Sequence, residues 1–201
     1  MMENENRDTA GHPALKPDPE FLRQHRFRLQ ELAGGQAPVA LFIGCSDSRV
    51  TPEMLFGLDP GQWFMLRNVG NIVPPYWKTE IGIASVLEYA VQILEVEQII
   101  VCGHTDCGAM QGLVQGVTLS QHPALARWLD VARPALATVD AHPSDYSGDE
   151  HHHALVTENV RLQLGHLESY PYIREAVAAG RLALRGCVYN LGMQAVEIVA
   201  G

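Results

Sequence analysis

Two short, unbroken runs of apolar residues, each ending at a residue that can bind a metal, constrain this chain more than any other feature. The first run, residues 39–43, leads through a glycine to Cys45. The second, residues 99–102 of a strand expected at 98–102, leads through a glycine to His104. Continuous apolar runs of this length are typical of strands buried on both faces of a parallel sheet. Ligands bind beyond the carboxyl ends of such strands. We therefore expect both glycines to turn the chain and both ligands to lie at one edge of a sheet.

The segments around these runs predict the fold class. Residues 62–66 indicate another strand, and residues 79–94 have the mixed faces of a helix that lies on a sheet. Strand and helix alternate in this way through residues 39–117, which favours parallel strands joined by right-handed crossovers. Residues 182–190 and 195–199 predict a closing antiparallel hairpin. The prediction is an α/β fold, a single domain with a mainly parallel β-sheet core flanked by helices.

The N-terminal part of the chain is expected to differ from this core. Residues 1–19 are polar and contain three prolines, so we interpret them as a flexible lead-in. Residues 20–33 have helical spacing and precede two glycines, which predicts an N-terminal helical arm. The 201 residues suffice for one domain with a proper core. We therefore place a single domain at residues 20–201.

Composition excludes several classes of partner. The formal net charge is −9, and the 14 basic residues are scattered, which argues against binding nucleic acid or an anionic membrane surface. No apolar run reaches the roughly 18 residues of a membrane span. The polar residues 1–19 lack the apolar core of a secretory signal, so we expect a cytoplasmic or other intracellular protein that is not secreted. In such a setting the four cysteines favour metal ligands or core positions over disulfides.

Cys45, His104 and Cys107 form the candidate metal site. A Cys₂His set suits zinc and leaves the fourth tetrahedral position to water, as catalytic zinc sites do. His104 and Cys107 are three residues apart, so one helical turn would present both to the same ion. A single cysteine after a strand is often only a small core residue, and it is the combination that favours a metal. We predict one catalytic Zn²⁺ per chain, while spacing alone leaves a fourth protein ligand open.

Asp47 and Arg49 are the candidate acid–base pair. They are two residues apart, so in an extended loop they share a face. A guanidinium holds a carboxylate with two hydrogen bonds, and a carboxylate held beside a zinc-bound water can orient the hydroxide. Because two thiolates make zinc a weaker Lewis acid than imidazoles do, we expect a higher water pKa and an activity that rises at mildly alkaline pH.

These motifs together resemble the signature of the β-class carbonic anhydrases. The resemblance rests on C-S-D-S-R at residues 45–49, R-N-V-G-N at 67–71, H-T-D-C-G at 104–108 and G-C-V-Y at 186–189. It implies a parallel sheet surrounded by helices, with the N-terminal helix reaching over a partner in a homodimer or larger homo-oligomer. It also implies an enzyme that reversibly hydrates CO₂ to bicarbonate and a proton by means of zinc-bound hydroxide.

The resemblance also assigns roles to single residues. Cys45, His104 and Cys107 match the zinc ligands, and Asp47 and Arg49 match the acid–arginine dyad. One branch of the family has an allosteric bicarbonate site and a tryptophan three residues before the first cysteine, a position that is Phe42 in this chain. Gln36 matches a glutamine that binds substrate in the other branch. The resemblance therefore favours that branch, in which water is the fourth zinc ligand. The residues that match its substrate pocket are Gln36, Phe64, Tyr89 and Gly108.

Four alternative functions compete with this one at the level of sequence. The same zinc site could act on CS₂ or COS, or the chain could be a non-enzymatic zinc-binding protein. A zinc deaminase needs H-x-E with P-C-x-x-C, and only the first occurs, at His166. Cys102 and Cys107 have the wrong spacing for a C-x-x-C redox couple. Cys102 and Cys187 each lie within an expected strand and are interpreted as core residues. The tract at residues 151–153 is interpreted as a solvated first helical turn rather than a second metal site.

Overall fold

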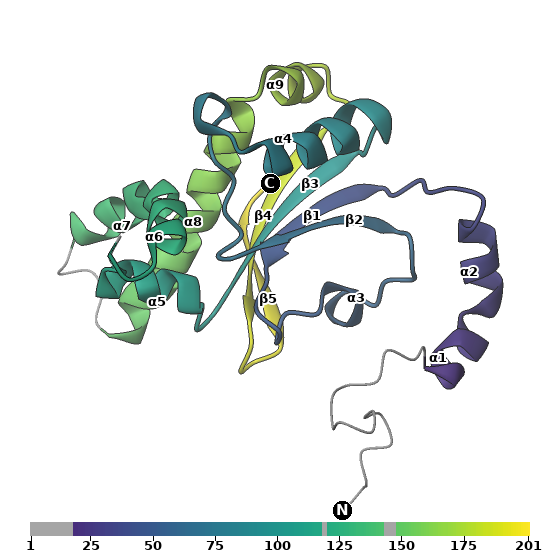
Figure 1. Ribbon diagram of the computed structural model, residues 1–201, viewed down its shortest axis with the longest axis horizontal. Helices are drawn as coiled ribbons and strands as arrows, with labels where there is room; N and C mark the ends of the chain where they lie inside the picture. The colour runs from purple at the N-terminus through teal and green to yellow at the C-terminus, as the bar shows by residue number, and fades with distance from the viewer. Residues whose placement is uncertain (1–17, 118–119, 143–147) are drawn as a thin grey trace, which may run out of the picture. The chain divides into compact units, whose positions relative to one another are not determined.

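The computed structural model describes residues 18–117, 120–142 and 148–201 (Figure 1). The chain divides into two compact units, Met1–Gln36 and Ala37–Gly201. In the first unit the helix expected over residues 20–33 is two helices, α1 (Pro19–Gln24) and α2 (Arg26–Leu32). The break falls at His25, whose φ of −101° and ψ of 9° leave the helical region. Asp18 caps α1, because its Oδ1 accepts the backbone N–H groups of Glu20 and Phe21 at 2.8 and 2.9 Å.

A five-stranded sheet forms the centre of the second unit. Its strand order is β2-β1-β3-β4-β5, in which the first four strands run parallel and β5 pairs antiparallel with β4. The predicted mainly parallel sheet and C-terminal hairpin are thereby confirmed. The strands are β1 (Ala40–Cys45), β2 (Trp63–Asn68), β3 (Gln98–His104), β4 (Ala183–Asn190) and β5 (Ala195–Ala200).

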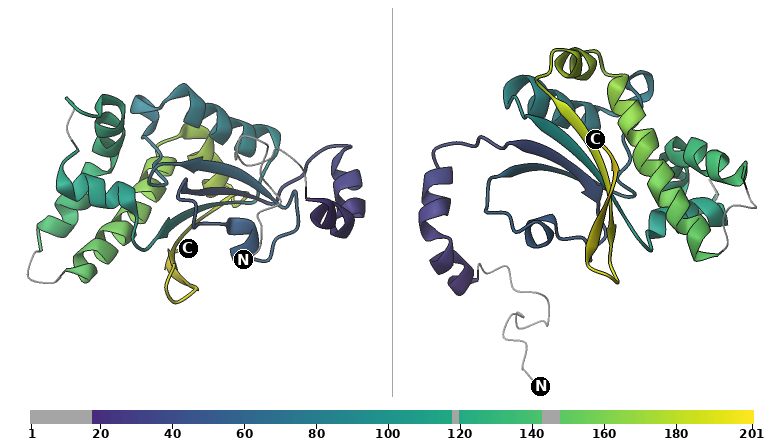
Figure 2. Two further views of the ribbon diagram at one scale, coloured as in Figure 1. Left: turned by 60° about the horizontal axis from the view of Figure 1, so that its bottom comes forward. Right: turned by 180° about the vertical axis from the view of Figure 1, so that it is seen from behind.

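The helices of this unit are unequally distributed over the two faces of the sheet. Figures 1 and 2 show α4 and α9 on one side and α3 on the other, with α8 running along the sheet. The bounds of the helices are α3 (Pro52–Leu55), α4 (Ile81–Glu88), α5 (Gly108–Gln115), α6 (Pro123–Leu129), α7 (Arg133–Asp140), α8 (Asp149–Glu168) and α9 (Pro171–Ala178). Shorter helical segments are η1 (Tyr76–Lys78), the π-helical η2 (Tyr89–Ile93) and η3 (Asp130–Ala132). None of the helices in the three described ranges is long and apolar enough to cross a bilayer.

Alternating residues of the central strands face two separate apolar clusters. Leu41 and Ile43 of β1 belong to the main core, which includes residues of α4, α8 and α9, whereas Phe42 belongs to a smaller cluster. That smaller cluster also contains Cys102 and Cys187, so the interpretation of these two cysteines as core is confirmed. Because strand side chains alternate, burial on both faces explains why the runs in the sequence are unbroken.

The two glycines that precede the candidate ligands do not turn the chain, contrary to expectation. Gly44 lies inside β1 and Gly103 inside β3, and both strands continue to the ligand residue itself. The glycines serve close packing instead. A Cβ at Gly103 would lie 2.9 Å from a methyl group of Val156 on α8. The absence of that Cβ lets the helix approach the sheet.

Candidate active site

Two neighbouring strands and one helix bring the predicted metal ligands together. Cys45 ends β1, His104 ends β3, and Cys107 is the residue before α5. Because β1 and β3 are paired in parallel, with Gly44 opposite Cys102, their carboxyl ends meet at one edge of the sheet. The two sulfurs and an imidazole nitrogen all lie within 4.8 Å of one another, and all three residues are buried. In the described ranges no other group of three His, Cys, Asp or Glu residues has this arrangement.

The connection between His104 and Cys107 is not the helical turn that their spacing suggested. His104 still has strand geometry, and Cys107 has the extended φ of −66° and ψ of 112° of a residue before a helix. Between them Asp106 adopts a positive φ of 55°. Aspartate tolerates this left-handed conformation better than most residues do. A tight turn therefore brings the two ligands to the same side.

The imidazole of His104 is set up as a ligand through one nitrogen. Its Nδ1 lies 2.8 Å from the backbone oxygen of Thr105. A carbonyl oxygen can only accept, so Nδ1 carries the proton and Nε2 has a free lone pair. Nε2 is fully buried and has no hydrogen-bond partner among the residues that the structure describes. A buried nitrogen without a partner normally costs about 1–3 kcal/mol. A metal ion between this nitrogen and the two sulfurs would remove that cost, so the residues fit a zinc ion.

The two thiols form a coupled pair. The pKa of the Cys45 thiol is lowered to about 4, chiefly because the Cys107 thiol hydrogen-bonds to its sulfur, although burial opposes the shift. The backbone N–H of Gly70 also donates to Cys45 Sγ, at 3.4 Å. The same thiol–thiol hydrogen bond raises the pKa of Cys107, and burial adds to that shift. The two sulfurs therefore titrate as a pair, and the first proton leaves this pair more readily than it leaves an isolated thiol.

Asp47 and Arg49 form the predicted ion pair, in a turn rather than an extended loop. Arg49 Nε donates to Asp47 Oδ1 at 2.9 Å, and Nη2 donates to Oδ2 at 2.7 Å. The backbone N–H of Arg49 also donates to Oδ1 at 3.0 Å. Arg49 holds the pKa of the Asp47 carboxyl well below its usual range. An ionised Asp47 Oδ2 lies 3.9 Å from His104 Nε2, beside the metal cluster.

Arg67 is a contributor to this site whose role the sequence did not indicate. Its Nε and Nη2 donate to the backbone oxygen of Cys45 at 3.0 and 2.9 Å, and Nη2 also donates to the backbone oxygen of Asp47 at 2.8 Å. Arg67 thus fixes the backbone that carries both a candidate ligand and the candidate acid. The R-N-V-G-N motif was the available signal, but a motif does not state which backbone atoms its arginine contacts.

The four predicted substrate-pocket residues lie in different parts of the structure. Gly108 is the first residue of α5, directly after Cys107. Phe64 and Tyr89 contact each other, with ring centroids 5.8 Å apart. Phe64 pairs with Leu41, four residues before Cys45 on β1, and so lies about 13 Å along the strand from that ligand. Gln36 belongs to the first unit. Their contact with substrate stays a prediction.

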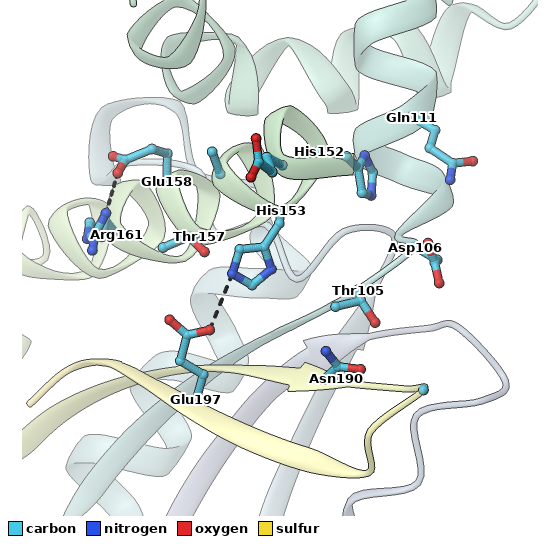
Figure 3. A pocket seen from close by; sticks show the side chains of 13 residues that line it. Thr105, Asp106, Gln111, His152, His153, Thr157, Glu158, Arg161, Asn190 and Glu197 are labelled. Atoms are coloured by element: carbon cyan, nitrogen blue, oxygen red, sulfur yellow. Dashed lines mark hydrogen bonds and ion pairs between the residues drawn. The ribbon is translucent and has the colours of Figure 1, made fainter. Parts of the chain in front are cut away.

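A cavity of about 910 Å³ adjoins the loop of the site but contains none of the three candidate ligands (Figure 3). Thr105 and Asp106 line it, together with residues from the start of α8 and from β5. His153 pairs with Glu197 across it, with Nε2 and Oε2 3.3 Å apart. Residues 151–153 are half-buried, so the expectation that they form a solvated turn was only partly right. They belong to no metal-binding group in the described ranges.

Most of this chain is similar in sequence and in structure to known proteins. A family model described as carbonic anhydrase matches residues 40–196. A carbonic anhydrase of Pseudomonas aeruginosa is 45% identical over 172 residues, which cover 86% of this chain and 78% of that protein. The solved structure of the β-carbonic anhydrase CcaA has a TM-score of 0.85 at 36% identity and covers 91% of this chain and 93% of its own. A structure from a study of two tetrameric β-carbonic anhydrases of Sordaria macrospora has a TM-score of 0.80 at 31% identity, with 89% of each chain covered.

Proposed function

Because this chain belongs to the β-class carbonic anhydrases, we propose that it hydrates CO₂ reversibly to bicarbonate and a proton at one zinc ion held by Cys45, His104 and Cys107. The observation that carries the zinc assignment is the buried, unpartnered Nε2 of His104 facing two thiols. Zinc is the metal that this donor set suits best. Both the zinc ion and the roles of the single residues are proposed, because membership of the family alone does not show them.

Zinc, when bound, supplies a Lewis acid that lowers the pKa of a water in its open position. The residues of the chain do the rest. Both oxygens of Asp47 are occupied by Arg49, which favours Asp47 as a neighbour of the metal rather than as a fourth ligand. An ionised carboxylate there accepts a hydrogen bond and orients the nucleophile. The N–H of Gly108, at the start of α5, is our candidate for holding a substrate oxygen.

We further propose that the active protein is a homo-oligomer. A relative with 31% identity comes from a study of tetrameric enzymes. The second unit of this chain also leaves large apolar side chains exposed, including Trp77 and Ile81. Exposed apolar patches mark surfaces that another chain covers.

Stopped-flow CO₂ hydration on protein with a measured zinc content tests the function. We expect one zinc per chain and fast hydration that increases from neutral to mildly alkaline pH. Cys45→Ser should lose both zinc and activity, whereas Asp47→Ala should keep zinc and lose most activity. A wild-type protein with one zinc and no CO₂ hydration would overturn the reaction and turn attention to CS₂ or COS. A pH–rate profile that stays flat would contradict the assignment of two thiolate ligands.

A further inference from the structure

The loop that donates a hydrogen bond to Cys45 is itself held by side chains outside the site. The peptide group between Val69 and Gly70 carries two polar atoms, the oxygen of Val69 and the N–H of Gly70. The N–H donates to Cys45 Sγ at 3.4 Å. The oxygen, on the opposite side of the same peptide plane, accepts from Trp128 Nε1 at 2.7 Å. Trp128 therefore fixes the plane whose other end points at the sulfur.

A second contact fixes the next peptide group. Asn159 of α8 is buried, and its Nδ2 donates to the oxygen of Gly70 at 3.0 Å. Its Oδ1 accepts from Gln163 Nε2 at 2.7 Å, and Gln163 Oε1 in turn accepts the N–H of Val73 at 2.9 Å. Buried amides that are linked by hydrogen bonds in this way hold one orientation only. Gly70 is thus held on both of its peptide groups.

The fit around Gly70 leaves it little room to move. Its φ is 81°, and a Cβ added there would lie 3.0 Å from the Cβ of Ala109. The structure is therefore built closely around a glycine at this position. Hydrogen bonds to a sulfur ligand reduce its donor strength, and outer partners of metal ligands tune the metal in this way.

We propose that Trp128 and Asn159 are positioning residues that aim the Gly70 N–H at Cys45 and so set the donor strength of this thiolate. The proposal rests on the function proposed above, because it concerns the same metal. Trp128 acts on the peptide plane itself, and a hydrogen bond to its oxygen also polarises its N–H. Asn159 acts through the peptide group between Gly70 and Asn71, and Gln163 in turn orients the side-chain amide of Asn159.

The test uses the full-length protein with cobalt(II) in place of zinc and compares Trp128→Phe with Trp77→Phe. Both changes remove an indole N–H and keep an aromatic ring, but Trp77 is exposed and makes none of the hydrogen bonds described above that hold the Gly70 peptide groups. We expect the thiolate-to-cobalt charge-transfer band to move to longer wavelength in Trp128→Phe only. With zinc, kcat should fall about tenfold, the low end for loss of an outer-shell partner, while KM changes less than twofold.

Asn159→Leu is a second, independent variant. Leu155→Ala removes a buried side chain from the same helix and controls for a loss of stability alone. The proposal predicts a band shift of the same sign in Asn159→Leu and none in Leu155→Ala. Band positions equal to wild type in both Trp128→Phe and Asn159→Leu would overturn the inference. The band needs bound cobalt but no turnover, so that result is distinct from a failure of CO₂ hydration, which the wild-type protein alone would reveal.

Discussion

At the scale of single residues, Asp47 is the side chain whose loss should separate chemistry from metal binding. Its carboxylate is ionised because Arg49 holds it with two hydrogen bonds. Asp47→Asn keeps the shape and removes the charge, so we expect kcat to fall about 100-fold with zinc content unchanged. Asp59→Asn, in an exposed turn, should keep full activity. Equal activity of the two variants in stopped-flow hydration would show that Asp47 has no role in the reaction.

The residues of the candidate metal site and its acid–arginine pair were predictable because their types are restrictive. Sulfur and imidazole ligands after two strands, and an acid two residues from an arginine, have few other uses in combination. Arg67, Trp128 and Asn159 were not predictable in the same way. Each acts on backbone atoms, which every residue possesses, so no pattern of side chains in the sequence identifies their partners.

At the scale of elements, the strands were predicted well and the turns less well. Unbroken apolar runs fix the existence of β1 and β3 because burial on both faces leaves no polar positions. A glycine in the sequence, in contrast, is compatible with a turn or with close packing. Gly44 and Gly103 were assigned to turns, but the structure has both inside strands. For Gly103 the deciding contact is with Val156 of α8, a segment some fifty residues away in the chain.

Substitutions at two glycines test this packing argument, because they should change the free energy of unfolding in opposite directions. A Cβ at Gly186 of β4 would lie 2.8 Å from methyl groups of Leu164 and Val160 on α8, whereas a Cβ at Gly165 of α8 would meet nothing within 4 Å. Gly186→Ala should lower the free energy of unfolding by about 1–3 kcal/mol. Gly165→Ala should raise it by up to about 1 kcal/mol, because alanine favours the helix. Urea denaturation of both variants measures the two changes, and a stable Gly186→Ala would refute tight packing of α8 on the sheet.

The attachment of α8 to the loop before α4 should depend on pH through His166. Its Nδ1 donates to the oxygen of Val73 at 2.8 Å. Burial lowers the pKa of His166, the Val73 oxygen opposes this, and Lys78 adds to it. The folded protein thus binds a proton less readily than the unfolded chain, whose histidine pKa is about 6.5. Stability from this residue is complete above that pH and is lost as the pH falls toward the lower folded value.

The corresponding variant is His166→Gln, which keeps an N–H donor for Val73 and cannot titrate. Acidification from about pH 7.5 to about pH 5.5 spans the range in which histidine changes charge. It should lower the urea midpoint of the wild type more than that of His166→Gln. The other histidines contribute equally to both proteins and cancel in this comparison. Equal losses of stability in the two proteins would contradict a neutral, half-buried His166.

At the scale of the whole molecule, the second unit has an apolar strip that its own core does not use. Ile81 of α4 is 88% exposed and Ile93 of η2 is 65% exposed, and Tyr89 lies between them. Their spacing of eight and four residues keeps them on neighbouring parts of one helical face. Ile83 and Leu87 of the same helix are buried, so the helix is apolar on two sides. A helix with two apolar sides needs two partners, and the sheet supplies only one.

A second copy of this chain is the partner that the proposed homo-oligomer provides. Ile81→Glu and Ile93→Glu place charges where apolar side chains would be covered, and a buried unpaired charge is strongly unfavourable. We expect light scattering after size exclusion to give a lower mass for both variants than for the wild type. Met193→Glu, at an exposed methionine in the β4–β5 turn, is the matched control and should keep the wild-type mass. If all three variants keep that mass, the strip along α4 and η2 is not an interface, and another surface must hold the oligomer together.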